Sequence, residues 1–162
     1  MEFSEYLKEF LNNDKYNELA NYIAHGKTTL LNHSINVSYL CYLYSIAKPK
    51  KKYDMNSLIR GSLLHDFYLY DWHNKNHKRP HGFHHPLIAF KNAIKYFDIN
   101  KIEENIIKTH MFPLTLFRIP KYKESWLVQK MDKKATFLEM KHKNVNFCLY
   151  ENDDKKGYNL WL

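Results

Sequence analysis

The sequence predicts an all-α protein, and it leaves open a short strand or β-hairpin near the C-terminus. Apolar residues recur at spacings of three and four along most of the chain, as on the buried face of a helix. The chain has only four glycines and five prolines, few for a turn-rich β architecture. Its 162 residues are the usual size of one domain with one core, so we expect a single domain over 1–162.

The apolar spacing and the capping residues place the helices along the chain. Residues 3–23 predict two short helices, with Asp14 as the N-cap of the second and His25–Gly26 at its end. Residues 73–84 are polar and histidine-rich, which indicates a loop, and Pro86 suits the first turn of the helix that follows. The remaining expected helices cover about 29–47, 54–66, 86–97 and 101–111, with a last long helix that opens at 123.

His33 lies inside the apolar stripe of the helix expected from about Thr29 to Ala47. It shares a face with Leu30 and Val37, so it points toward the core. Taken alone, His33 is best explained as a core histidine with satisfied hydrogen bonds. His33 becomes a candidate ligand only together with the other polar residues that lie within apolar helical patterns.

The densest histidine cluster is the stretch RGSLLHDFYLYDWHNKNHKRPHGFHHP, residues 60–86. Its His65-Asp66 pair ends an apolar helix and offers one nitrogen and one oxygen ligand to a single metal. Imidazole suits zinc, iron, nickel and copper, whereas carboxylate suits magnesium and manganese. The pair therefore predicts a metal site without selecting the metal.

Six ionisable residues lie on or beside predicted helices, among residues that should face the core. Burying so many would be costly unless they satisfy one another or bind a common cation. A helical bundle can collect ligands from facing helices in this way. The six are His33, His65, Asp66, His85, His110 and Asp132.

The order of a helical His, a His-Asp pair and a late helical Asp resembles the HD-domain superfamily of metal-dependent phosphohydrolases. The strings LLHDFYLYDWH, HGFHHP, KTHMFPLT and MDKKATFLE are similar to a branch of small bacterial HD-family proteins. The resemblance covers residues 30–139. It implies one helical HD-type domain, with 141–162 as a C-terminal tail that packs on it.

The resemblance also implies the ligands of one or two divalent ions, which could be Mn, Fe, Co, Mg, Ni or Zn. In family members with two metals, two further histidines bind the second ion and the Asp of the pair bridges both. His85 and His110 match these positions, and His81, four residues before His85, stays open as an alternative. The first ion would be bound by His33, His65, Asp66 and Asp132.

The implied activity is hydrolysis of a phosphate ester of a small molecule, with a nucleotide favoured, by metal-activated water. Asp66 is one candidate catalytic residue. Asp71 is the other, either as a carboxylate that orients a ligand histidine or accepts a proton, or simply as the cap of the next turn. Several HD branches have a lysine where this chain has Leu69, which speaks against the cyclic-dinucleotide branch. The candidate phosphate-binding residues are Lys78, Arg79, Arg118 and Lys121.

The formal charge of +8 favours anionic partners and leaves two alternatives to a phosphohydrolase. One is a nucleotide- or nucleic-acid-binding module without hydrolytic activity, which we favour less because the lysines form no single stripe. The other is an HD-fold di-iron oxygenase. The N-terminus does not resemble a signal peptide, no apolar run is long enough for a membrane span and cysteines are few, so we expect a cytoplasmic protein without a membrane partner. A homodimer is left open.

Overall fold

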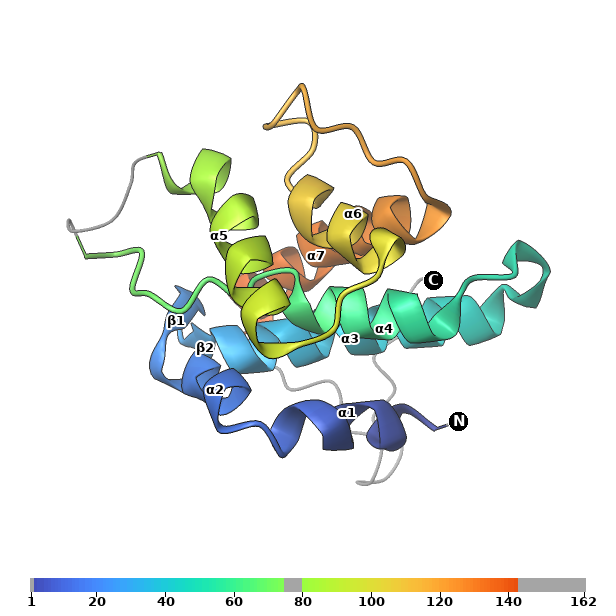
Figure 1. Cartoon of the computed structure of the whole chain (residues 1–162), viewed down its shortest axis with the longest axis horizontal. Coiled ribbons are helices and arrows are strands. Elements are labelled where there is room, and N and C mark those ends of the chain that lie inside the picture. Colours follow the sequence, from blue (N-terminus) through green and yellow to red (C-terminus); the bar gives the residue numbers. More distant parts are fainter. Residues whose placement is uncertain (1, 75–79, 143–162) are drawn as a thin grey trace.

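The computed structural model describes residues 2–74 and 80–142 (Figure 1). Within these residues, seven α-helices and two short 3₁₀ helices surround one hydrophobic core, and the only sheet has two strands. The predicted all-α class is therefore confirmed. The elements are α1 (Phe3–Leu11), α2 (Asp14–Asn17), η1 (Glu18–Asn21), β1 (Ile23–His25), β2 (Thr28–Thr29), α3 (Leu30–Ala47), η2 (Pro49–Lys51), α4 (Met55–Leu64), α5 (His81–Tyr96), α6 (Lys101–Thr109) and α7 (Lys123–His142).

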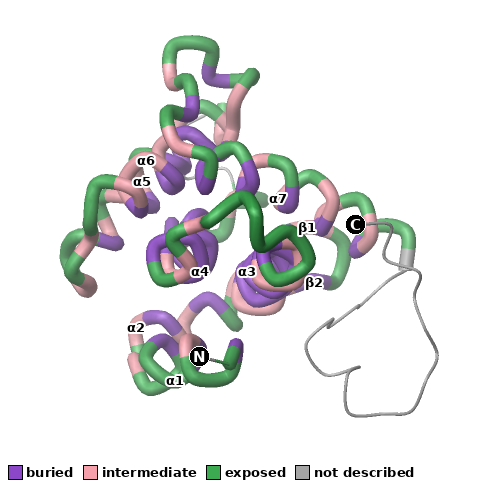
Figure 2. Tube along the Cα trace, turned by 90° about the vertical axis from the view of Figure 1, so that its right-hand side faces the viewer, coloured by how far each residue is buried: buried purple, intermediate pink, exposed green. Residues whose placement is uncertain are grey.

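Helices α3 and α4 form the centre of the molecule. They run side by side, with α1 and α2 on one flank and α5, α6 and α7 on the other (Figure 2). Helix α3 is buried around most of its circumference between residues 33 and 41, beyond the single stripe that the sequence predicts. Consequently, polar side chains near its start are enclosed by neighbouring helices.

Side-chain caps set the starts of three of the helices that carry the site. The Thr29 hydroxyl accepts a hydrogen bond from a backbone N–H in the first turn of α3, and the Asp54 carboxylate does the same for α4. Asn100 and Glu103 form a reciprocal capping box at the start of α6. These starts agree with the sequence prediction because the capping signal is local.

The segment before α3 differs from the prediction. Asn13, not Asp14, caps α2, whose α-helical part ends already at Asn17. Residues 23–25 then form a strand that pairs antiparallel with Thr28–Thr29, and Gly26 adopts the left-handed φ of 58° in the turn. The indole N–H of Trp72 donates to the carbonyls of residues 23 and 24, so contacts distant in sequence support this hairpin. This hairpin lies near the N-terminus and was not predicted from the sequence.

Helix α5 begins at His81, five residues before the expected start, and Pro80 precedes it. Pro86 therefore lies inside the helix, which gives up the hydrogen bond that a residue with an N–H would donate to the carbonyl of Gly82. The early start places His81 and His85 one turn apart on the same helix. At the other end of the chain, residues 141 and 142 belong to α7. The rest of the expected C-terminal tail, with the short strand or hairpin left open there, lies outside the described residues.

Gly61 allows α4 and α6 to approach closely. A Cβ atom at this position would lie 2.6 Å from Cδ1 of Ile106. This contact brings together the ends of the two helices, where the rings of His65 and His110 have centroids 5.0 Å apart. In the part of the chain that the structure describes, no helix combines the length and the apolar character needed to cross a membrane.

Candidate metal centre

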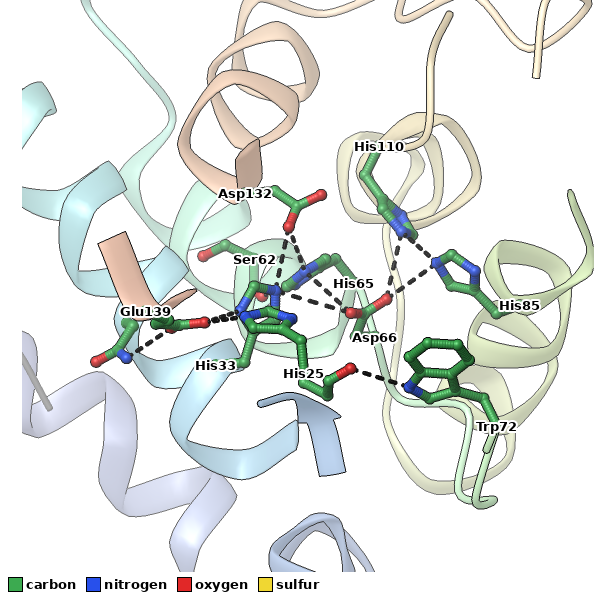
Figure 3. A network of polar contacts seen from close by, with 12 residues as sticks. His25, His33, Ser62, His65, Asp66, Trp72, His85, His110, Asp132 and Glu139 are labelled. Atoms are coloured by element: carbon green, nitrogen blue, oxygen red, sulfur yellow. Dashed lines mark hydrogen bonds and ion pairs between the residues drawn. The ribbon is translucent and has the colours of Figure 1, made fainter. Parts of the chain in front are cut away.

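The structure brings all six predicted metal ligands together at one end of the α3–α4 pair (Figure 3). The helices contribute them from different positions: the second turn of α3, the ends of α4 and α6, the second turn of α5 and the middle of α7. The residues are His33 from α3, His65 and Asp66 from the end of α4, His85 from α5, His110 from the end of α6 and Asp132 from α7.

The first group consists of His33, His65 and Asp132, whose ligand atoms all lie within 4.8 Å of one another. Oδ1 of Asp132 is 3.1 Å from Nε2 of His33 and 3.8 Å from Nε2 of His65. Oδ2 of Asp66 lies 3.8 Å and 3.6 Å from the same two nitrogens. Neighbouring ligands of a cation bound at about 2.1 Å are roughly 3.0–3.5 Å apart, so small side-chain movements would complete the coordination of one ion.

The second group consists of Asp66, His85 and His110. Oδ1 of Asp66 is 3.1 Å from Nε2 of His85 and 3.3 Å from Nε2 of His110. Asp66 therefore turns one carboxylate oxygen toward each group. This arrangement suits a carboxylate that bridges two cations.

Hydrogen bonds to backbone carbonyls fix the tautomer of three of the histidines. Nδ1 of His65 lies 2.6 Å from the carbonyl of Ser62, and Nδ1 of His110 lies 2.8 Å from that of Ile107. These carbonyls belong to the last turns of α4 and α6, where a helix leaves its carbonyls unpaired. Nδ1 of His85 is 3.2 Å from the carbonyl of residue 81. A carbonyl can only accept, so each Nδ1 carries the proton and each Nε2 faces the centre.

Two features would be costly in a purely structural polar cluster. Nε2 of His65 is buried without a hydrogen-bond partner among the described residues. Nε2 of His85 and Nε2 of His110 lie 2.8 Å apart, which sets two lone pairs against each other unless one nitrogen is protonated. A cation would satisfy these nitrogens, and so the residues present fit a metal ion.

Burial and charge act against each other in the centre. Burial alone would raise the pKa of Asp66 and Asp132, but the surrounding histidines outweigh it and hold both pKa values below the usual range. Burial lowers the pKa of His65. For His33, burial acts in the same direction, yet hydrogen bonds to Asp132 and Glu139 raise its pKa well above the usual value. The carboxylates are therefore ionised and ready to bind a cation.

One edge of the centre meets solvent. The side chains of Asp66 and Asp132 are 14% and 13% exposed, whereas those of His33, His65 and His110 are at most 2% exposed. The two aspartate side chains are thus less buried than the imidazoles, although Oδ1 of Asp66 is itself buried and has no hydrogen-bond partner among the described residues.

Glu139 and His25 were not predicted from the sequence, although both belong to the same polar network. Oε2 of Glu139 lies 2.9 Å from Nδ1 of His33 and 2.5 Å from Nε2 of His25. Glu139 follows Asp132 by seven residues, which is two helical turns on one face, so the spacing could have indicated it. His25 has no such signal, because a contact across 114 residues leaves no local pattern.

His81 lies beside the centre without joining either ligand group. Its ring stacks on His85, with centroids 4.5 Å apart and planes 16° from parallel, and its Nδ1 is 2.8 Å from the Tyr70 hydroxyl. Of these two histidines, it is His85 that forms a ligand group with Asp66, and its Nε2 lies 3.1 Å from Oδ1 of Asp66. The structure therefore favours His85 over His81 as the ligand.

Asp71 lies in an exposed turn, with 54% of its side chain accessible. Its Oδ1 accepts a hydrogen bond from the backbone N–H of His73 and lies 3.2 Å from Nδ1 of the same residue. These contacts agree with the turn-capping interpretation of Asp71, and they do not support its interpretation as a group that orients a buried ligand.

The candidate phosphate-binding residues are not gathered at the centre. Arg118 and Lys121 line a groove of about 600 Å³ formed by the segment before α7 and the outer face of α6. That face of α6 carries Lys101 and Lys108, whereas His110 lies on the opposite face, toward the core. Lys78 and Arg79 lie outside the described residues.

Comparisons of the chain with protein-family models, with curated proteins and with solved structures gave no match. The resemblance to the HD-domain superfamily therefore stays a prediction from the ordered ligand residues.

Proposed function

We propose that this protein is a metal-dependent phosphohydrolase that cleaves a phosphate ester of a small molecule, with a nucleotide as the favoured substrate, on an HD-type metal centre. The observation that carries the proposal is the position of Asp66. Its two oxygens face two different histidine groups, as a bridge between two cations would require. The order of these ligands along the chain adds the resemblance to phosphohydrolases.

In this proposal, one divalent cation would be held by His33, His65, Asp66 and Asp132, and a second by Asp66, His85 and His110. Bound divalent cations would supply Lewis-acid chemistry at the phosphoryl oxygens and would lower the pKa of water toward neutral pH. The buried imidazoles keep their Nε2 atoms directed at the centre.

In this proposal a phosphate ester approaches from the side of Asp66 and Asp132, whose side chains are 14% and 13% exposed. The net charge of +8 favours the approach of an anionic substrate. Asp66 is the proposed catalytic residue. The contacts of Asp71 with His73 give no support for a catalytic role of Asp71.

The test is a hydrolysis assay on a panel of phosphate esters and nucleotides, with manganese, cobalt or iron added in turn. We expect metal-dependent release of phosphate or of the alcohol, which is lost in an Asp66→Asn variant prepared in parallel. Metal-free protein that stays metal-free after incubation with each ion, together with no hydrolysis, would contradict the proposal.

Two further measurements separate the alternatives. For a binding module without hydrolytic activity, binding to single-stranded nucleic acid would weaken steeply with salt and would be unaffected by Asp66→Asn. A di-iron oxygenase would bind iron selectively and consume oxygen with its substrate. We expect neither result from a phosphohydrolase.

A further inference from the structure

A second polar cluster lies directly behind His33, on the side away from Asp66. It consists of Glu139 from α7, His25 from β1 and Asn36 from α3. The Glu139 side chain is fully buried, and its two oxygens are shared among three partners. Oε2 meets His25 at 2.5 Å and His33 at 2.9 Å, while Oε1 accepts from the Asn36 amide at 2.7 Å.

His25, His33 and Glu139 are also close enough together to bind a cation of their own. The hydrogen bonding speaks against this use. A neutral imidazole has one protonated nitrogen and one lone pair. In His33, Nδ1 must carry the proton if Nε2 is to bind a cation beside Asp132, and that proton points at Glu139.

The two clusters also differ in how well their polar atoms are satisfied. In the cluster behind His33, each polar side-chain atom of Glu139 has a partner. In the metal centre, the buried Nε2 of His65 has no hydrogen-bond partner among the described residues. A buried ligand atom without a partner has room for a bound ion, whereas the satisfied oxygens of Glu139 are already used to hold neighbouring side chains in place.

We propose that Glu139 is a positioning residue, which accepts the Nδ1 proton of His33 and thereby directs Nε2 of His33 toward the cation of the proposed centre. His25 and Asn36 hold the Glu139 carboxylate in that position. A carboxylate behind a ligand histidine fixes its tautomer and ring orientation and strengthens it as a donor. This inference rests on the proposed metal centre.

The electrostatics of Glu139 agree with this role. Burial by itself would raise the pKa of its carboxyl, but hydrogen bonds from His25 and His33 outweigh it and lower the pKa well below the usual value. Glu139 therefore accepts hydrogen bonds as a carboxylate. Because its partners come from β1 and α3, the same carboxylate ties the N-terminal hairpin to the start of α3 and to α7.

The test replaces Glu139 by glutamine, which keeps the shape of the side chain and removes its charge. Cobalt(II) is titrated into the full-length variant, and its affinity is measured by competition with a chelating dye. We expect binding about 10- to 100-fold weaker than in the wild type, with an unchanged number of ions bound. The visible spectrum of bound cobalt should also change, because the orientation of His33 is no longer fixed.

Glu103→Gln is the matched control. Glu103 is a buried helical glutamate, it lies two turns from the ligand His110 as Glu139 lies two turns from Asp132, and it pairs with Arg60. We expect this variant to keep wild-type cobalt affinity and spectrum. A second test variant, His25→Gln, changes a side chain that is 19% exposed, and should weaken cobalt binding in the same direction but less.

The outcomes are distinguishable. If the wild type binds cobalt and Glu139→Gln binds it equally well with the same spectrum, the positioning role is wrong while the metal centre stands. If Glu139→Gln loses one bound ion and the remaining ions bind as in the wild type, Glu139 is a ligand of a separate site, which also overturns the inference. If the wild type binds no cation, the proposed function and the positioning role of Glu139 both fail. If Glu139→Gln does not fold, the result for His25→Gln decides.

Discussion

At the scale of single residues, the centre depends on Asp66. Its two carboxylate oxygens face different histidine groups, so every cation that binds there should use it. His85, in contrast, contacts only one of the two oxygens. The two side chains can therefore be told apart by how many bound ions each one affects.

We predict that Asp66→Ala weakens cation binding in both groups by more than about 100-fold. Removing a residue that only holds a ligand in place typically costs about 10- to 100-fold in affinity, and loss of a ligand should cost more. His85→Ala should weaken only the group that contains His110. Elemental analysis and titration with manganese measure both effects, and circular dichroism checks the folding of each variant. An Asp66→Ala protein that retains as much manganese as the wild type would refute the bridging role.

The pH dependence of metal binding follows from the raised pKa values of His33 and His110. Burial alone would lower both pKa values, but contacts with neighbouring carboxylates raise them, so these histidines take up a proton more readily than an ordinary imidazole. A cation needs the lone pair of Nε2 and must displace such a proton. Affinity should therefore fall as the pH falls from about 8 to about 6, by roughly tenfold per pH unit for each displaced proton.

Calorimetric titration of manganese in two buffers with different ionisation enthalpies measures the protons released. We expect about one proton or more per bound ion near neutral pH. Binding that is independent of both pH and buffer would show that these histidines are already unprotonated, contrary to the hydrogen bonds seen here.

The six ligands were predictable because each combines a polar side chain with a place in an apolar helical pattern. His33 alone resembled an ordinary core histidine, and only the ordered set indicated a cation. Glu139 carried a usable signal in its spacing from Asp132. His25 carried none, because its contact arises only when β1 and α7 pack together.

At the scale of helices, the position of the ligands depends on how closely α4 approaches α6. His65 and His110 sit just past the last turns of these helices, and Gly61 faces Ile106 at their contact. A side chain at residue 61 would push the two helix ends apart. The spacing of the candidate metal centre is therefore linked to a glycine outside it.

Gly61→Ala should destabilise the protein by about 1–3 kcal/mol, because the added Cβ overlaps the Ile106 side chain. Ile106→Val removes the Cδ1 atom responsible for the shortest contact, and alone should cost about 0.5–1.5 kcal/mol. Urea denaturation of the two single variants and the double variant gives their coupling. We expect the double variant to be more stable than the sum of the single changes implies, and additive effects would contradict this account of the contact.

The helix starts show which elements the sequence determines locally. Thr29, Asp54 and Asn100 cap helices where the pattern predicts them, since a cap and the first turn lie within a few residues. The start of α5 was misplaced because Pro86 suits a first turn, yet here it sits inside the helix. The β1–β2 hairpin was missed because its strands are very short and bonds from Trp72 support it from outside.

At the scale of the whole molecule, the ligands tie together five helices that the sequence separates widely. An ion bound by all of them binds the folded chain and not the unfolded one. Its binding energy therefore adds to the stability of the fold.

Manganese at about 100 times its dissociation constant should raise the free energy of unfolding by about 2.7 kcal/mol per site. Thermal unfolding should accordingly shift to higher temperature with manganese and back again with a chelator. The Asp66→Ala protein serves as the control, and should show no such shift. An equal shift in both proteins would mean that manganese stabilises the fold from somewhere else.

The most direct test of the central claim, that distant helices share one inorganic centre, is an anomalous-scattering map from crystals grown with manganese. The account predicts one or two peaks within about 2.0–2.3 Å of the Asp66 carboxylate. One peak should lie beside His33, His65 and Asp132, and a second, if present, beside His85 and His110. The absence of any peak at Asp66, or a peak bound by His25 and Glu139 in its place, would contradict it.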